Sequence, residues 1–80
     1  MATKDTMEYL GAAKRFIRAA GARVADADDF ELAELLTLQE ELDDAVAVAV
    51  RGIRERGMSW AYIAGAVGCT RQAAYQRWGR

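Results

Sequence analysis

The stretch that decides the fold runs from Met58 to Arg80 and reads MSWAYIAGAVGCTRQAAYQRWGR. Ser59 and Thr70 are suitable N-caps, because a hydroxyl oxygen accepts a hydrogen bond from an amide in the first turn of a helix. Gly68 follows the first run of apolar residues, and a glycine there adopts the left-handed conformation that ends a helix at little steric cost. The stretch therefore predicts two short helices that meet at a steep angle.

These two helices, expected over residues 59–67 and 70–78, each have an apolar face at helical spacing. The apolar face of the first helix consists of Trp60, Ile63, Ala64 and Val67, and that of the second consists of Ala73, Ala74 and Trp78. We expect Trp60 and Trp78 in the core, because each buries about 150–250 Å², a large share of the apolar area in a small domain. Cys69, in the turn, is expected to be a small buried hydrophobe rather than a redox sensor.

The stretch resembles the bacterial helix-turn-helix motif at three positions. Ala64 matches its small residue, Gly68 its turn glycine and Ala74 its buried position in the second helix. The TRQAA sequence over residues 70–74 is similar to the start of the recognition helix in many bacterial and phage regulators. The resemblance implies a small transcriptional regulator that binds double-stranded DNA sequence-specifically, with residues 70–78 in the major groove.

The side chains expected to contact DNA lie mainly on the second helix, whose N-terminal residues would face base edges. Arginine pairs with guanine and glutamine with adenine through two hydrogen bonds, so Arg71 and Gln72 are the candidates for reading bases. Tyr75 and Gln76 lie one turn further along. The alternative for these residues is a polar surface without a ligand. The full candidate set is Ser59, Thr70, Arg71, Gln72, Tyr75, Gln76, Arg77 and Arg80, with Ser59, Arg77 and Arg80 expected at phosphates.

The composition indicates a small helical protein without catalytic chemistry. The 80 residues are 52% hydrophobic and 29% charged, which is typical of a globular domain. The absence of proline favours helix throughout. One cysteine and no histidine rule out an intramolecular disulfide, a Cys/His zinc site and a Ser-His or Cys-His catalytic unit. We therefore expect no enzyme activity, no cofactor and no metal.

Neither a signal peptide nor a membrane span is apparent in the sequence. The longest apolar run, Ala45–Val50, is far shorter than the roughly 20 residues a membrane helix needs. We expect a cytoplasmic protein with no membrane partner.

Charge is strongly segregated along the chain. Residues 1–23 carry five basic and two acidic side chains, residues 24–50 carry nine acidic and no basic ones, and residues 51–80 carry six arginines and one glutamate. A clustered basic region, rather than the net charge of −1, is the electrostatic feature expected of a DNA-binding protein. The alternative is that the arginines only solvate helix ends. The acidic residues have no histidine or glycine loop to organise them, so they are expected to form a solvated face.

Residues 6–56 predict a long antiparallel pair of helices. Apolar residues recur at 3–4 spacing over residues 6–24, where Thr6 is the expected cap. A second helix over residues 28–56 begins at the expected cap Asp28, with Glu31 at the capping-box position. The alternating valines of Ala45–Val50 have no polar face between them, so helix is preferred over strand there.

The long second helix has an apolar arc of roughly 160°, wider than one partner helix covers. The whole apolar arc would be covered if the first helix packed on one part of it and a second copy of the chain on the rest. The expected fold is therefore an all-α single domain over residues 1–80. It would consist of a hairpin arm over 6–56 followed by a helix-turn-helix over 57–80, four helices in total. A homodimer through the arm would place two recognition helices about 34 Å apart on a two-fold symmetric DNA site.

An alternative function is a protein–protein interaction module. In that case the Leu-rich, acidic long helix would bind another protein, and the helix-turn-helix would be structural only. A chain that binds DNA and also recruits a protein is a third possibility.

Overall fold

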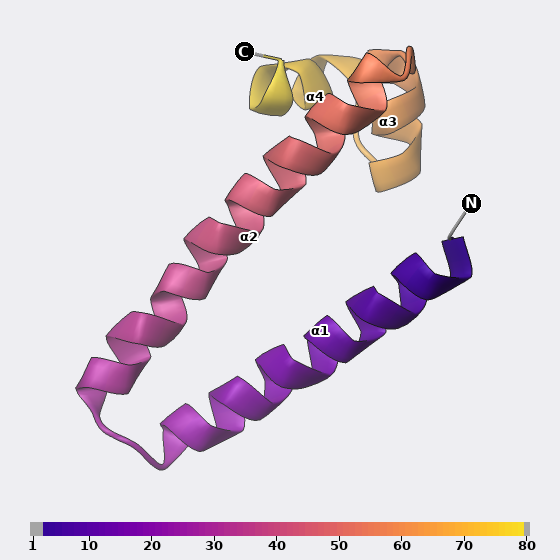
Figure 1. The fold of residues 1–80 in the computed structure, drawn as a ribbon. Helices are drawn as coiled ribbons and strands as arrows, with labels where there is room; N and C mark the ends of the chain where they lie inside the picture. The colour runs from indigo at the N-terminus through magenta and orange to yellow at the C-terminus, as the bar shows by residue number, and fades with distance from the viewer. Residues whose placement is uncertain (1–2, 80) are drawn as a thin grey trace. The chain divides into compact units, whose positions relative to one another are not determined.

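The computed structural model describes residues 3–79, with side chains from Asp5 onward. This part of the chain contains four α-helices and no strand, so the all-α prediction is confirmed. Arg80, a candidate DNA contact, lies outside the described residues. The helices are α1 Thr3–Ala25, α2 Asp29–Glu55, α3 Trp60–Val67 and α4 Arg71–Trp78 (Figure 1).

The chain divides into two compact units, Met1–Gln39 and Glu40–Arg80. The boundary falls inside α2, which is continuous across it. The first unit contains α1 and the start of α2, and the second contains the rest of α2 together with α3 and α4. No helix among the described residues has the length and apolar character needed to cross a membrane.

The first helix starts earlier than predicted. Thr6 was expected to be its N-cap, but α1 begins at Thr3 and Thr6 lies within it. No glycine or proline interrupts residues 3–6, and the negative charge of Asp5 is favourable in the first turn of a helix. Local capping preference at Thr6 is therefore outweighed by continued helix formation.

Asp28 caps α2 as the sequence predicts. Its carboxylate oxygen Oδ1 accepts a hydrogen bond from the amide of Phe30 at 3.1 Å. A hydrogen bond with the side chain of Glu31, and then the amide of Phe30, hold the pKa of Asp28 below its ordinary value of 3.8. The charged form of this cap is thus the form that stabilises the start of α2.

Acidification should weaken this cap. Because the pKa of Asp28 is lower in the folded chain, its contribution to stability is present above pH 3.8 and is lost as the pH falls through the lowered value. Asp28→Asn keeps a capping side chain that does not titrate. We therefore expect thermal melts, followed by circular dichroism, to lose less stability on acidification in Asp28→Asn than in the wild type. An equal loss in both chains would show that the Asp28 cap has no part in the acid response.

A small core joins α2, α3 and α4 in the second unit. The buried side chains among the described residues are Val50, Ile63, Ala64 and Ala74. The two alanines are on α3 and α4, so these helices approach each other closely at that point. Small side chains at the crossing therefore fix the packing of the pair.

Two tryptophan side chains are less buried than predicted. Trp60 and Trp78 are only half-buried, and Val67 is 55% exposed. The close approach at Ala64 and Ala74 leaves too little room between the helices for an indole, so both tryptophans lie at the edge of the core. Val67 belongs to the last turn of α3, beyond the part that α4 covers. The prediction of a core position was too strong for the two tryptophans, and Val67 on the same apolar face of α3 is exposed.

The corner between α3 and α4 is made by Gly68, Cys69 and Thr70. Gly68 has φ 83° and ψ 33°, the left-handed conformation, and its amide donates to the carbonyl of Ala64 at 2.9 Å. The amide of half-buried Cys69 donates to the same carbonyl at 3.0 Å. Two hydrogen bonds to the carbonyl of Ala64 and a left-handed glycine thus end α3, and α4 begins after only three further residues.

Alanine substitutions at two neighbouring glycines should have opposite effects. A Cβ at Gly68 would meet no atom within 4 Å, so Gly68→Ala should cost only the left-handed strain, about 1–2 kcal/mol. Gly65 lies inside α3 with equally open surroundings, and Gly65→Ala should stabilise the fold by about 0.5–1 kcal/mol. Urea denaturation measures both. Equal effects in the two variants would contradict the assigned corner.

Candidate nucleic-acid interface

The N-terminus of α4 is held by Thr70, and its first two side chains point outward. The hydroxyl oxygen Oγ1 of Thr70 accepts a hydrogen bond from the amide of Ala73 at 3.0 Å. Arg71 and Gln72 follow directly and are both exposed. Thr70 therefore acts as a cap, as predicted, while the two predicted base-reading residues have no covering side chains in their own unit.

The remaining candidates on α4 lie on different sides of the helix. Ala74 is 0% exposed and marks its buried side. At 100° per residue, Gln72 and Gln76 lie about 160° from Ala74, so they form the centre of the exposed face. Arg71 and Tyr75 lie on one flank of that face, and Arg77 on the other. The outward face of α4 therefore carries two glutamines, with basic side chains on both flanks.

A shallow hollow adjoins the Arg71 flank. It has a volume of about 330 Å³ and is lined by Trp60, Arg71, Gln72 and Tyr75. The ring of Tyr75 meets the ring of Trp60 edge-on, with centroids 5.6 Å apart and planes at 90°. This contact holds Tyr75 in place although it is 53% exposed. The structure thus brings three of the predicted contact residues together around one concave surface.

Ser59 lies next to this hollow at the start of α3. Its Oγ accepts a hydrogen bond from the amide of Tyr62 at 3.0 Å, which makes it the N-cap of α3. Trp60, the next residue, is part of the hollow that Arg71 and Gln72 line. The first residues of α3 and α4 therefore line one hollow, and the first-turn amides of a helix favour an anion.

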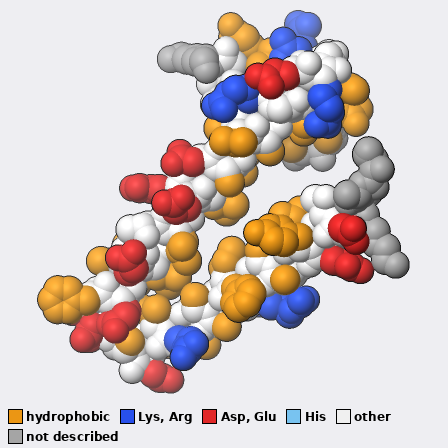
Figure 2. Space-filling view, in the orientation of Figure 1, with side chains coloured by type: hydrophobic (Ala, Val, Ile, Leu, Met, Phe, Trp, Pro, Cys, Tyr) orange, Lys and Arg blue, Asp and Glu red, His pale blue; other side chains and the backbone are white. Residues whose placement is uncertain are grey.

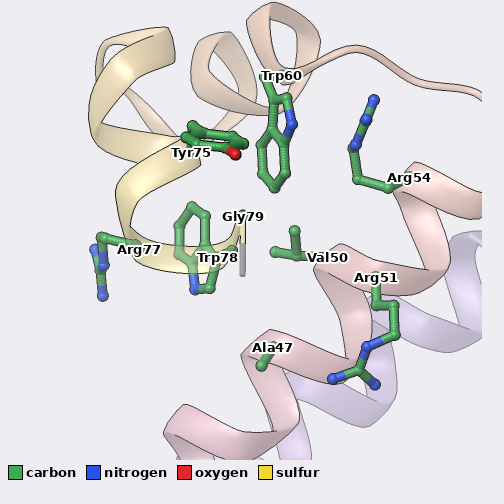
Figure 3. A pocket seen from close by; sticks show the side chains of 9 residues that line it. All are labelled: Ala47, Val50, Arg51, Arg54, Trp60, Tyr75, Arg77, Trp78 and Gly79. Atoms are coloured by element: carbon green, nitrogen blue, oxygen red, sulfur yellow. The ribbon is translucent and has the colours of Figure 1, made fainter.

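Arg77 takes part in a second cavity, which faces α2 (Figure 3). This cavity has a volume of about 460 Å³ and contains no acidic side chain. Its lining residues are Ala47, Val50, Arg51, Arg54, Trp60, Tyr75, Arg77, Trp78 and Gly79. Three arginines and three aromatic rings around one cavity create a positive, partly apolar surface beside α4.

Two of these arginines are positioned by indole rings. The guanidinium of Arg54 lies 4.9 Å from the ring centroid of Trp60, and Nη1 of the same side chain donates to the carbonyl of Met58 at 2.7 Å. The guanidinium of Arg77 lies 4.8 Å from the ring of Trp78. Cation–π contacts of this kind stabilise by about 0.5–1 kcal/mol at exposed sites. Both half-buried tryptophans therefore orient basic side chains.

Arg51 is not among the contact residues predicted from the sequence. The signal that would have found it is its spacing on α2, where Ala47, Arg51 and Arg54 recur at intervals of four and three residues. This row adjoins buried Val50, so it lies on the side of α2 that faces α3 and α4. The basic end of the chain therefore includes α2 as well as α4.

The distribution of charge along α2 agrees with the segregation in the sequence. Acidic side chains follow its first part, whereas basic side chains gather towards its end and over α3 and α4 (Figure 2). Among the described residues, no group of three or more potential metal ligands comes together.

Comparison with known proteins gives no match: no family model fits the chain, and neither the curated proteins nor the solved structures contain one similar to it.

Proposed function

We propose that the protein binds double-stranded DNA sequence-specifically and acts as a small transcriptional regulator, with α4 in the major groove. The observation that carries the proposal is the exposure of Arg71 and Gln72 in the first turn of α4. A recognition helix contacts base edges with its N-terminal residues, and these two side chain types match guanine and adenine. If these two side chains were buried in the core, they could not contact bases and the proposal would have no basis.

The surroundings of α4 support contact with phosphates. The start of α3 and the start of α4 border one hollow, and capped helix N-termini attract anions. Arg77 lies on the opposite flank from Arg71, so basic groups border the exposed glutamines on both sides. In this proposal Gln72 and Gln76 enter the groove, while Arg71 reads a base and Ser59, Thr70 and Arg77 contact the sugar–phosphate backbone.

The acidic part of α2 restricts which end of the chain DNA can approach. Seven acidic and no basic residues lie between Asp29 and Asp44, and this segment repels a polyanion. DNA would therefore approach only the arginine-rich end of the chain. This role needs no catalytic group, so we propose a non-enzymatic protein.

The second candidate function, a protein-interaction module, is favoured by one observation. Large apolar side chains of the first unit are exposed, which marks an interaction surface. We assign that surface below to a second copy of the chain. The two functions then concern different parts of the molecule and do not exclude each other.

Salt dependence tests the proposed function. If about three or four basic side chains neutralise phosphates, the logarithm of duplex affinity should fall with the logarithm of salt concentration, with a slope of about −3 to −4. Fluorescence anisotropy with labelled duplex from the region flanking the protein's own gene measures this slope. A random duplex of equal length is the control and should bind more weakly. No binding at low salt to either duplex would reject the proposal.

A further inference from the structure

Most of the large apolar side chains in the first unit are exposed. Nine of them are 44–82% exposed. They are Met7, Tyr9, Leu10, Phe16, Ile17, Phe30, Leu32, Leu36 and Leu38. Exposed apolar surface on this scale is a feature of interaction sites.

Three of the exposed residues, Leu10, Ile17 and Leu32, belong to regular heptad seams on the two long helices. In α1 the seam alternates by four and three residues through Thr6, Leu10, Ala13, Ile17, Ala20 and Val24. In α2 it alternates by three and four through Leu32, Leu35, Gln39, Leu42, Val46, Ala49 and Ile53. Gln39 is the only polar residue of the α2 seam. Seams of this spacing are typical of helices that pack side by side in bundles and coiled coils.

The α2 seam lies on a different side of the helix from α3 and α4. Those two helices cover the side of α2 that carries Ala47, Val50 and Arg54. At 100° per residue, the seam is centred about 120° away from that side. Leu42, near the middle of the seam, is accordingly 56% exposed. The α3–α4 pair therefore leaves Leu42 exposed, while Val46 and Ile53 of the same seam are half-buried.

The turn between α1 and α2 also contains unfilled space. A hollow of about 380 Å³ lies there, bordered mainly by apolar groups that include Val24, Leu32 and Leu35. The side chains of the two helices do not fill the angle between them.

Charge indicates how two copies would pair. Residues 3–25, which form α1, contain five basic and two acidic residues, whereas Asp29–Asp44 of α2 contains seven acidic and no basic ones. Two α2 helices side by side would repel each other, while α1 beside α2 brings opposite charges together. We propose that two copies associate through α1 and α2 into a four-helix bundle, with each α2 packed against α1 of the partner and Gln39 in the bundle core.

The inference goes beyond the DNA-binding proposal and is tested without DNA. Sedimentation equilibrium of the full chain should give twice the 8.8 kDa chain mass. Leu42→Glu places a charge in the seam and should weaken association by at least about tenfold. Thr37→Glu adds the same charge about 140° away around α2 and should change the dissociation constant less than about threefold. Equal effects of the two variants would overturn the proposal.

Gln39→Leu keeps the test valid if Leu42→Glu fails to fold. A polar residue in a seam lowers the stability of the bundle, so Gln39→Leu should tighten association by about tenfold. In a chain that stays monomeric, Gln39 is exposed and the same change would bring no gain. An unchanged dissociation constant in Gln39→Leu would therefore contradict the bundle.

The sign of the salt effect tests the pairing of opposite charges. Raising NaCl from about 50 mM to about 500 mM should raise the dimer dissociation constant, because salt screens the attraction between α1 and the partner's α2. A fall would mean that like-charged α2 helices lie together, and it would reject this arrangement. A chain that remains a monomer at every concentration would reject the dimer altogether, while duplex titration would still report separately on DNA binding.

Discussion

Ile63→Ala should lower the stability of the second unit by about 2–5 kcal/mol. Ile63 is 2% exposed and is the largest side chain of α3 in the small core with Val50, Ala64 and Ala74. Its truncation removes buried area and leaves a cavity that the neighbouring alanines cannot fill. A unit of this size has a stability of only about 0.05–0.15 kcal/mol per residue. The loss is therefore comparable with the whole stability of the unit.

Val67→Ala is the matched control for this prediction. Val67 lies one turn further along α3 and is 55% exposed, so its truncation should cost less than about 0.5 kcal/mol. Circular dichroism during urea denaturation compares the two variants. Similar losses would mean that Ile63 is not the centre of the core.

Arg71→Ala combined with Gln72→Ala should have the largest effect on DNA binding. Each side chain that makes two hydrogen bonds to a base contributes about 1–3 kcal/mol of discrimination. The double variant should therefore lose about 30- to 20,000-fold in affinity for the preferred duplex and approach the affinity for random duplex. Because both residues are exposed, their removal should leave the thermal melt of the protein almost unchanged.

Two further variants separate base reading from simple charge attraction. Arg71→Lys keeps the charge but loses the planar pair of donors, so it should lower specificity more than overall affinity. Arg18→Ala removes one positive charge from the exposed surface of α1 and should affect duplex binding little. If Arg18→Ala weakened binding as strongly as Arg71→Ala, general electrostatics rather than α4 would account for the affinity.

The local features of the fold could be predicted because they depend on neighbouring residues. Ser59, Gly68 and Thr70 determine where α3 and α4 begin and end, through hydrogen bonds that span three or four residues. Asp28 does the same for α2. Thr6 was the exception. A residue that is suitable as an N-cap marks the start of a helix only where the residues before it do not themselves favour helix.

Burial could not be predicted equally well, because it depends on which helices meet. Periodicity identifies an apolar face but not its partner. Trp60 and Trp78 were assigned to the core, yet the small residues at the α3–α4 crossing leave them at its edge beside Arg54 and Arg77. Arg51 was missed for the same reason, since its role depends on the packing of α3 and α4 against α2.

The candidate site was predictable in part. The exposure of Gln72 and Gln76 follows from their position about 160° from buried Ala74 around one helix. The hollow that joins Trp60 to Arg71 and Tyr75 was not predictable, because it is formed by two helices. Partner and operator sequence are properties of a complex, so no pattern within one chain determines them.

The central claim is that the exposed face of α4 contacts DNA. The most direct measurement is a set of ¹⁵N–¹H NMR spectra of the full chain during titration with the duplex it prefers. The proposal predicts that amide shifts concentrate at residues 59–62 and 70–77, with little change at residues 29–44. Shifts confined to the acidic part of α2, or no shift with a duplex at low salt, would contradict it.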